Sequence, residues 1–212
     1  MRAPELGVTT LSTYAFSQDN WRRPAEEVSA LMALLRGYLA TEIDRLADAG
    51  VRLRVLGRRD RLPDGIADLI GRAETATAGG TRLDLRIAID YSGRGAILAA
   101  VSTVAAGAAT CEDVSRQLEQ HGGGPGVDLL IRTSGEQRLS DFLLWEAAYA
   151  ELYFVETFWP DFDGTALARA LDAFRTRERR FGGAGRGAKT AEKQPPRSLV
   201  RHIRTLLAWS AR

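Results

Sequence analysis

The chain has 212 residues, of which 45% are hydrophobic and 26% charged, as in an ordinary globular protein long enough for one α/β domain. Its net charge of +2 gives no field over the whole molecule that would favour nucleic acid as a partner. The lone cysteine, Cys111, excludes an internal disulfide and a cysteine-based metal site, and it fits a reducing cytoplasm. We find no signal peptide and no apolar stretch long enough to span a bilayer.

Apolar periodicity predicts strands and helices that alternate along the chain. At the N-terminus, residues 4–6 have the pattern of a last helical turn, and Gly7 is typical of the residue that stops a helix. In chain order the patterns then predict a strand at 8–16, a helix at 25–46, a strand at 51–56, a helix at 66–73, a strand at 83–89, helices at 97–104 and 112–119, a strand at 127–131, a helix at 142–150, a strand at 152–154 and a helix at 167–174.

This alternation predicts a mostly parallel central sheet flanked by helices, formed by residues 1–183. Residues 184–197 are rich in Gly, Lys and Pro and predict a flexible linker. Residues 198–212 predict a basic amphipathic C-terminal helix. That helix has two interpretations: an ordinary solvated terminal helix, or a helix that docks on an anionic membrane surface.

The most informative stretch is residues 131–154. Arg132, Glu136, Arg138 and Ser140 fall within nine residues of one another, directly after a predicted strand. Arginine offers paired donors to phosphate oxygens and serine adds a hydroxyl, so the cluster suits a phosphorylated ligand. Glu151 further on could hold a divalent cation bound to the same phosphates. The alternative interpretation is a solvated polar turn with a surface ion pair.

Two other polar clusters, residues 17–23 and 90–94, also follow directly on predicted strands. Ligands of parallel sheets bind at the carboxyl ends of the strands, so all three clusters are expected at one edge. Arg23, Arg132 and Arg138 would then surround a diphosphate. The apolar faces of the helices at 25–46 and 142–150 are most simply core. If part of them lined a cleft beside this site, the ligand would be an amphiphile with a long apolar tail.

Three segments resemble the cis-prenyltransferases, the undecaprenyl diphosphate synthase family. They are YAFSQDNWRRPAEEV, RTSGEQRLSDFLLWEAAYAELYF and RERRFGG, and the resemblance runs from about Leu6 to Gly183. It implies an undecaprenyl diphosphate synthase-like fold and cis-prenyl chain elongation, the condensation of isopentenyl diphosphate with an allylic prenyl diphosphate. It also implies Mg²⁺ as cofactor and a homodimer with a hydrophobic tunnel. The lone cysteine predicts a cytoplasmic protein, and the membrane-docking interpretation of the C-terminal helix would add a peripheral contact with the inner face of the membrane.

The resemblance also assigns roles to single residues. Asn20 resembles a catalytic residue that helps to remove a proton, and Glu151 is similar to a Mg²⁺ ligand. Arg179 to Gly183 resemble an ending that reaches the active site across a dimer. The implied substrate-binding residues are Ser17, Gln18, Asp19, Trp21, Arg23, Arg132, Glu136, Arg138, Leu139 and Ser140.

The chain departs from the family at its start. The family begins with a strand, an Asp-Gly-Asn-Gly-Arg-Trp loop whose Asp binds Mg²⁺, and a helix; we expect the first strand and most of the first helix to be missing here. Either the recorded start is a downstream codon, or the chain is a truncated paralogue or a non-catalytic binding subunit of a full-length synthase. We expect little condensation activity from these 212 residues alone. Smaller departures are Ser134 in place of Gly and Asp90 in place of a common Asn.

Overall fold

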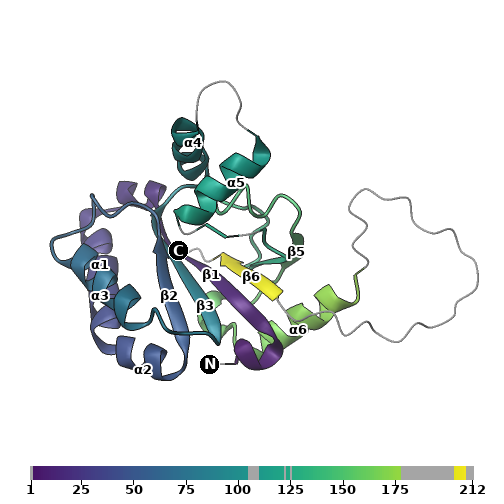
Figure 1. Cartoon of the computed structure of the whole chain (residues 1–212). Coiled ribbons are helices and arrows are strands. Elements are labelled where there is room, and N and C mark those ends of the chain that lie inside the picture. The colour runs from purple at the N-terminus through teal and green to yellow at the C-terminus, as the bar shows by residue number, and fades with distance from the viewer. Residues whose placement is uncertain (1, 105–109, 122, 125, 178–202, 209–212) are drawn as a thin grey trace, which may run out of the picture.

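The computed structural model describes residues 2–104, 110–121, 123–124, 126–177 and 203–208. Its centre is a six-stranded sheet in the order β2-β3-β1-β6-β4-β5, and every neighbouring pair of strands is parallel (Figure 1). The predicted parallel sheet flanked by helices is therefore confirmed. The strands are β1 (Val8–Ser17), β2 (Val51–Leu56), β3 (Leu83–Tyr91), β4 (Leu129–Arg132), β5 (Glu151–Phe154) and β6 (Ile203–Ala208).

Most helices lie where apolar periodicity predicts them, but one of them is broken in two and two predicted helices are not observed. The predicted helix over residues 25–46 is interrupted at Glu42, where the first helix is capped and the second begins. Three short 3-10 turns complete the described elements. The helices are α1 (Ala25–Thr41), α2 (Ile43–Asp48), α3 (Ile66–Ala76), α4 (Gly93–Thr103), α5 (Cys111–Gln120) and α6 (Gly164–Arg175), and the turns are η1 (Pro4–Leu6), η2 (Gln18–Arg22) and η3 (Trp159–Asp161).

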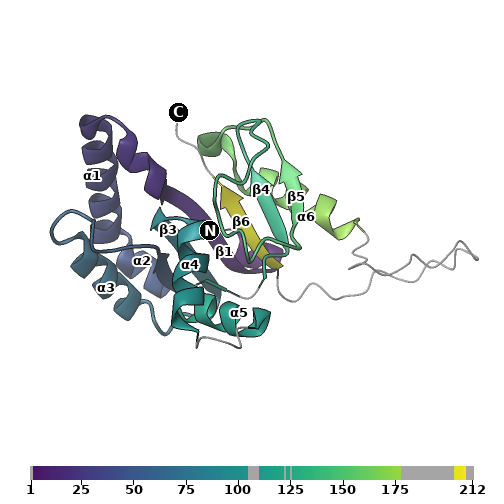
Figure 2. The same ribbon diagram turned by 90° about the horizontal axis from the view of Figure 1, so that it is seen from above.

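Helices cover both faces of the sheet (Figure 2). On one face, α1, α3 and α6 contribute to the main core together with Leu129 and Ile131 of β4. On the other face, Leu130 packs with Tyr14 and Phe142, and α4 and α5 lie beyond them. Successive residues of β4 thus point to opposite cores, as the alternation of side chains along a strand requires.

The N-terminal turn forms as predicted, although as a 3-10 turn. The backbone N–H of Gly7 donates to Pro4 O at 3.1 Å, and Gly7 has a φ of 87°, which glycine adopts without strain. At the other end, the predicted amphipathic helix over 198–212 is wrong where the chain is described. Ile203–Ala208 form β6, which pairs with β1 on one side and β4 on the other. Backbone pairing on both edges outweighs the helical spacing of the apolar residues. The predicted linker at 184–197 lies outside the described residues.

The predicted helix over residues 142–150 is also wrong. The segment is a series of turns, and Ser140, Asp141 and Leu143 all have positive φ, which no α-helix contains. Phe142 is fully buried and stacks on Tyr14 at 4.3 Å between ring centroids. This packing on the sheet fixes a conformation that the apolar pattern alone does not distinguish from a helix.

The longest described helix has 17 residues, and none of the described helices has the length and apolar content to cross a membrane.

Candidate active site

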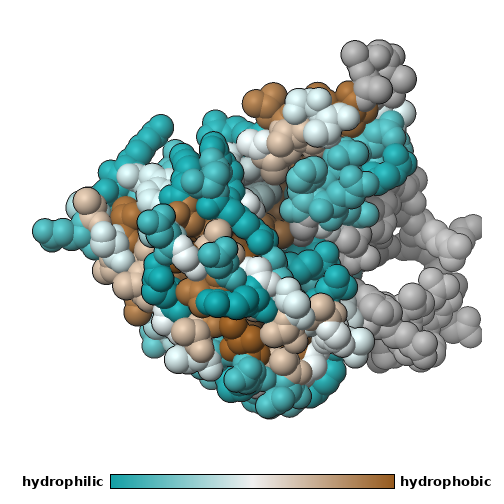
Figure 3. Space-filling model, turned by 60° about the vertical axis from the view of Figure 1, so that its left-hand side comes forward, coloured by the Kyte–Doolittle hydropathy of each residue, from teal (hydrophilic) through white to brown (hydrophobic). Residues whose placement is uncertain are grey.

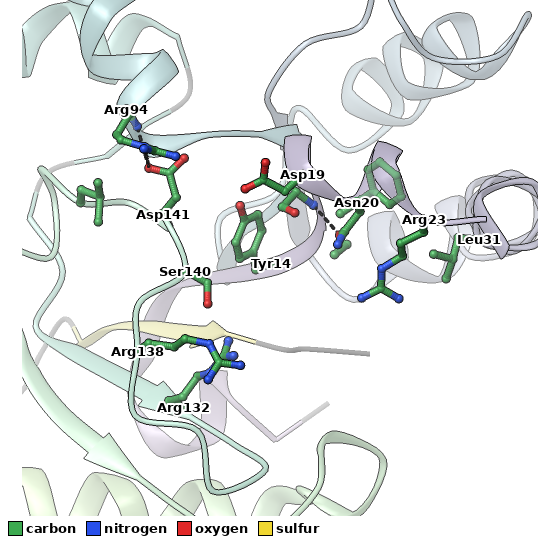
Figure 4. Close-up of a pocket in the computed structure, with 14 residues that line it drawn as sticks. Tyr14, Asp19, Asn20, Arg23, Leu31, Arg94, Arg132, Arg138, Ser140 and Asp141 are labelled. Atoms are coloured by element: carbon green, nitrogen blue, oxygen red, sulfur yellow. Dashed lines mark hydrogen bonds and ion pairs between the residues drawn. The ribbon is translucent and has the colours of Figure 1, made fainter. Parts of the chain in front are cut away.

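A pocket of about 520 Å³ lies at the carboxyl ends of β1 and β4. Residues from two directions face each other across it (Figure 4). Asn20 and Arg23 extend from η2 and the residue after it, and Arg132 and Arg138 extend from the end of β4 and the following loop. The sheet edge therefore brings together polar clusters that are more than a hundred residues apart in the sequence. The lining also includes Ser17, Asp19, Arg94, Ser140 and Asp141.

Arg132 is the dominant cation of the pocket. It is the last residue of β4 and only 1% exposed, yet its Nε and Nη1 atoms have no hydrogen-bond partner within the described chain. Burial, followed by the neighbouring charge of Arg138, lowers the pKa of Arg132. A buried guanidinium with two unpartnered nitrogens is unfavourable unless a ligand supplies an anion. The arrangement therefore points to an anionic ligand with several oxygen acceptors.

The loop after β4 adds a second cation and a hydroxyl. Arg138 lies beside Arg132 in Figure 4, and it forms an ion pair with Glu136, which is mostly buried. Ser140 has a φ of 50° and is exposed at the pocket. Glu136 itself does not line the pocket, so it acts on the site through Arg138.

The wall of the pocket opposite Arg132 and Arg138 is formed by η2, a short 3-10 helix, and the residues on either side of it. The Ser17 backbone N–H donates to Asn20 Oδ1 at 2.9 Å, and the Ser17 side chain caps the backbone of Asn20 in return. Since the amide oxygen of Asn20 is used within the turn, its amino group is the part that it can offer to a ligand. Arg23 forms an ion pair with Glu27 one helical turn later and also lines the pocket.

Four predicted substrate-binding residues do not line this pocket: Gln18, Trp21, Glu136 and Leu139. Gln18 lines a neighbouring cavity of about 440 Å³, and Leu139 packs against the core around Phe142. The indole N–H of Trp21 donates to Asp90 Oδ1 at 2.9 Å, so Trp21 is held inside the protein.

Glu151, the predicted metal ligand, is likewise not brought to the pocket. It is the first residue of β5 and pairs with Leu129 at the start of β4, about 10 Å along the strand from Arg132. Its carboxylate accepts a hydrogen bond from Arg177 at 2.8 Å.

The described residues of the pocket do not form a Mg²⁺ site on their own. Mg²⁺ prefers carboxylate oxygens with free coordination positions. Asp141 accepts hydrogen bonds from Ser92 and Arg94, and Asp19 lies 3.5 Å from Arg22. Within the described ranges no group of three or more His, Cys, Asp or Glu could hold a metal ion.

Sequence reasoning did not single out several lining residues, among them Tyr14, Leu31 and Asp141. Tyr14 and Leu31 look like ordinary core positions in a strand and a helix. Asp141 stands next to the predicted Ser140. It is joined to the cluster at 90–94 by hydrogen bonds that its carboxylate accepts from Arg94 at 3.0 and 3.2 Å and from Ser92 at 2.5 Å, and by one that its backbone oxygen accepts from the Gly93 N–H at 2.7 Å.

An apolar groove of about 510 Å³ adjoins the pocket and shares four lining residues with it: Tyr14, Ala15, Phe16 and Leu31. The groove runs between α1 and α2 on one side and β1, β2 and β3 on the other. On the side of the molecule that Figure 3 brings forward, apolar surface lies in patches among hydrophilic side chains. A polar, cationic pocket that continues into an apolar groove fits an amphiphile with a charged head. Further lining residues of the groove include Met32, Leu35, Leu39, Leu53, Leu85 and Ile87.

Comparison with known proteins agrees with this geometry. Residues 2–182 match the model of a family described as "Putative undecaprenyl diphosphate synthase". Isoprenyl transferase 1 of Bradyrhizobium diazoefficiens is 62% identical over 182 residues, which cover 85% of this chain and 74% of that protein. The (2E,6E)-farnesyl-diphosphate-specific ditrans,polycis-undecaprenyl-diphosphate synthase of Haemophilus ducreyi is 46% identical over 189 residues, covering 85% of this chain and 78% of that protein.

The fold is similar to a solved structure as well. The crystal structure of a probable undecaprenyl diphosphate synthase from Campylobacter jejuni superposes with a TM-score of 0.77 at 33% identity. The match covers 85% of this chain and 86% of that one.

Proposed function

Because the chain belongs to the undecaprenyl diphosphate synthase family, we propose that its activity is cis-prenyl chain elongation, in which isopentenyl diphosphate condenses with an allylic prenyl diphosphate. The observation that carries this proposal is the buried guanidinium of Arg132, two of whose nitrogens have no hydrogen-bond partner in the described part of the chain, in a pocket that opens into an apolar groove. A diphosphate supplies the oxygen acceptors that this guanidinium lacks, and a prenyl tail fills an apolar groove.

In the proposed complex, Arg132, Arg138 and Ser140 hold the diphosphate of isopentenyl diphosphate, and Arg23 closes the site from the opposite wall. The alkene carbon of isopentenyl diphosphate forms a bond to the allylic carbon of the partner substrate. The bond from that carbon to its diphosphate oxygen breaks, and a proton leaves the new chain to the departing diphosphate. Asn20 stands beside this site and donates from its amino group, since its oxygen is bound by Ser17. Positioning and charge neutralisation are the main contributions of the protein.

The predicted Mg²⁺ stays a prediction. The pocket carboxylates, Asp19 and Asp141, are paired with Arg22, Arg94 and Ser92, and Glu151 lies away from them. Arginine side chains therefore carry the charge neutralisation in this proposal. A calorimetric titration with Mg²⁺ in the presence and absence of pyrophosphate would detect a metal that binds only with the ligand.

We further propose that the chain forms a homodimer through the edge strand β5. The residues Tyr149, Leu152, Phe154 and Phe158 expose between 38% and 79% of their surface on and beside this strand. Among the described strands β5 lies at the edge of the sheet, and an edge with exposed apolar side chains is a surface that a second copy would cover. Sedimentation velocity should give a dimer for the wild type and a monomer for Phe154→Asp. A monomeric wild type would contradict this proposal.

The predicted cytoplasmic location and the predicted contact with the membrane stay predictions. The C-terminal helix that was expected to contact the membrane is not observed, because residues 203–208 form a strand inside the sheet.

The function is tested by calorimetric titration of isopentenyl diphosphate into the wild type and Arg132→Gln. Hydrogen bonds between charged groups contribute about 1.5–3 kcal/mol, so we expect Arg132→Gln to weaken binding about 10- to 100-fold. Arg116→Gln, on the exposed face of α5, is the matched control and should bind like the wild type. Absence of binding by the wild type, or equal binding by Arg132→Gln, would overturn the proposal.

Turnover is measured separately, as incorporation of labelled isopentenyl diphosphate onto farnesyl diphosphate in the presence of Mg²⁺. Condensation supports the proposed enzyme. Binding without condensation supports the alternative, a binding subunit or impaired paralogue.

A further inference from the structure

Asp90 has a position that the proposed reaction does not use. It lies near the end of β3, is 0% exposed, and has a φ of 50°. One carboxylate oxygen accepts the indole N–H of Trp21 at 2.9 Å, and the other accepts Arg61 Nε at 2.9 Å. A second nitrogen of Arg61 bonds to the first oxygen. These contacts compensate the buried charge of Asp90. Asp90 does not line the ligand pocket, so it is not a catalytic residue.

Trp21 is held on three sides by this arrangement. Its ring meets Phe16 edge-on at 5.1 Å between centroids, and the guanidinium of Arg61 lies 5.8 Å from the ring centroid. Asp90 binds the indole N–H. An indole with a fixed N–H, a packed edge and a cation near its ring has little rotational freedom.

Arg61 reaches Asp90 because its loop is itself anchored on β3. Gly57 has a φ of 109°, and a Cβ at this position would lie 2.1 Å from Ile89 O, so only glycine permits the approach. The backbone N–H of Arg58 then donates to Asp90 O at 3.2 Å. Further along, Arg59 bonds both carboxylate oxygens of Glu74 on α3, at 2.8 and 2.9 Å.

Trp21 belongs to η2, the turn that forms one wall of the pocket. Asn20 precedes it directly and is bonded to Ser17, and the backbone N–H of Arg23 donates to Asn20 O at 3.1 Å. These two hydrogen bonds couple Ser17, Asn20 and Arg23 within the turn that contains Trp21. Fixing the indole of Trp21 therefore fixes the two pocket residues beside it, Asn20 and Arg23.

We propose that Asp90 is a positioning residue, which holds the Asn20–Arg23 wall of the diphosphate pocket through Trp21 and Arg61. The proposal depends on the proposed function only for the identity of the ligand. Asp90 can do this because Trp21 of η2 and Arg61 of the loop between β2 and α3 both donate hydrogen bonds to its carboxylate.

The test measures hydrogen exchange of residues 17–23 without ligand. Asp90→Asn keeps the shape but leaves an amide group facing Arg61, and we expect exchange in this segment to quicken about tenfold or more, as for loss of local structure. Arg61→Met should also speed hydrogen exchange of residues 17–23. Because the Arg61 side chain is partly exposed, this variant is the one to use if Asp90→Asn does not fold.

Asp84→Asn is the matched control. Asp84 lies on the same strand and accepts hydrogen bonds from Arg54 and Arg86, but it is at the opposite end of β3 from the pocket. This variant should lose stability and leave exchange at residues 17–23 unchanged. Wild-type exchange in Asp90→Asn and in Arg61→Met would overturn the proposal, whether or not the protein binds a diphosphate.

A second readout is the affinity for isopentenyl diphosphate. We expect Asp90→Ala to weaken it about tenfold, and to have little further effect when Trp21 is already Phe, because Asp90→Ala and Trp21→Phe both remove the hydrogen bond between the Asp90 carboxylate and the indole N–H. Equal losses in the two backgrounds would overturn the route through Trp21. If the wild type binds no isopentenyl diphosphate, the proposed function fails, and the exchange experiment still decides the role of Asp90.

Discussion

At the scale of single residues, Arg132 combines burial with two guanidinium nitrogens that have no hydrogen-bond partner among the described residues. Such a group lowers the stability of the free protein and is retained where a ligand needs it. Asn20, Asp90 and Arg138, by contrast, all have partners within the chain. Among these four residues, Arg132 is therefore the one at which binding and stability oppose each other.

We predict that Arg132→Leu raises the free energy of unfolding by about 1–3 kcal/mol while it abolishes diphosphate binding, because a buried unpaired charge is replaced by an apolar side chain. Urea unfolding measures the stability, and titration with pyrophosphate measures the binding. A variant that is less stable than the wild type would show that the charge is compensated in the free protein.

The buried carboxyl group of Glu146 should make the stability of the protein depend on pH. It is 6% exposed, its Oε1 has no partner in the described chain, and burial raises its pKa above the usual 4.5. The folded protein thus binds this proton more tightly than the unfolded chain does. The contribution of neutral Glu146 is full below the unfolded pKa and is lost as the pH rises through the folded pKa.

Replacing Glu146 by Gln should therefore stabilise the protein at neutral pH by about 1–3 kcal/mol, and the difference should shrink as the pH falls toward 4.5. Thermal unfolding over a pH series measures the effect. Glu119→Gln, an exposed glutamate of α5, should leave the profile unchanged. A constant difference at all pH values would show that titration of Glu146 is not its cause.

At the scale of elements, the groove beside α1 should determine tail binding separately from head binding. We predict that Leu35→Trp, which fills part of the groove, weakens binding of farnesyl diphosphate about tenfold, a loss equivalent to about 1.4 kcal/mol. Affinity for pyrophosphate should not change, since Leu35 does not line the cationic pocket. Leu98→Trp, on the exposed face of α4, is the control. Equal losses for both ligands would contradict a separate site for the tail.

Elements with a strong local pattern could be predicted from the sequence, and elements fixed by distant contacts could not. The strand Val8–Ser17 and the cluster Arg132–Ser140 have clear residue patterns, and the carboxyl-end rule for parallel sheets joined them correctly. Residues 142–150 follow an apolar pattern that suits a helix, but stacking of Phe142 on Tyr14 imposes turns. The roles of Trp21 and Asp141 depend on hydrogen bonds to Asp90 and Ser92, which no local pattern reveals.

At the scale of the whole molecule, β6 joins the two halves of the sheet. Among the described strands, β1 and β4 each pair with β6 and not with each other. The η2 wall of the pocket follows β1, and the Arg132–Ser140 wall follows β4. The distance between the two walls therefore depends on β6, together with the packing of Phe142 on Tyr14.

We predict that deletion of residues 199–212 abolishes tight pyrophosphate binding, and that a synthetic peptide of these residues restores it when added in excess. The same peptide carrying Thr205→Pro should fail, because proline removes a backbone donor from the pairing with β1 and β4. Wild-type binding by the shortened chain would show that β6 is not required for the pocket.

The central place of β6 also has a consequence for how the chain folds during synthesis. Val8 pairs with Ile203, so the middle of the sheet joins residues from opposite ends of the sequence. Such contacts slow folding, because a long loop must close before they form. Until Ile203–Ala208 leave the ribosome, β1 and β4 have open edges, which attract other strands and promote aggregation. We therefore expect the nascent chain to depend on chaperones until residues 203–208 have paired with β1 and β4.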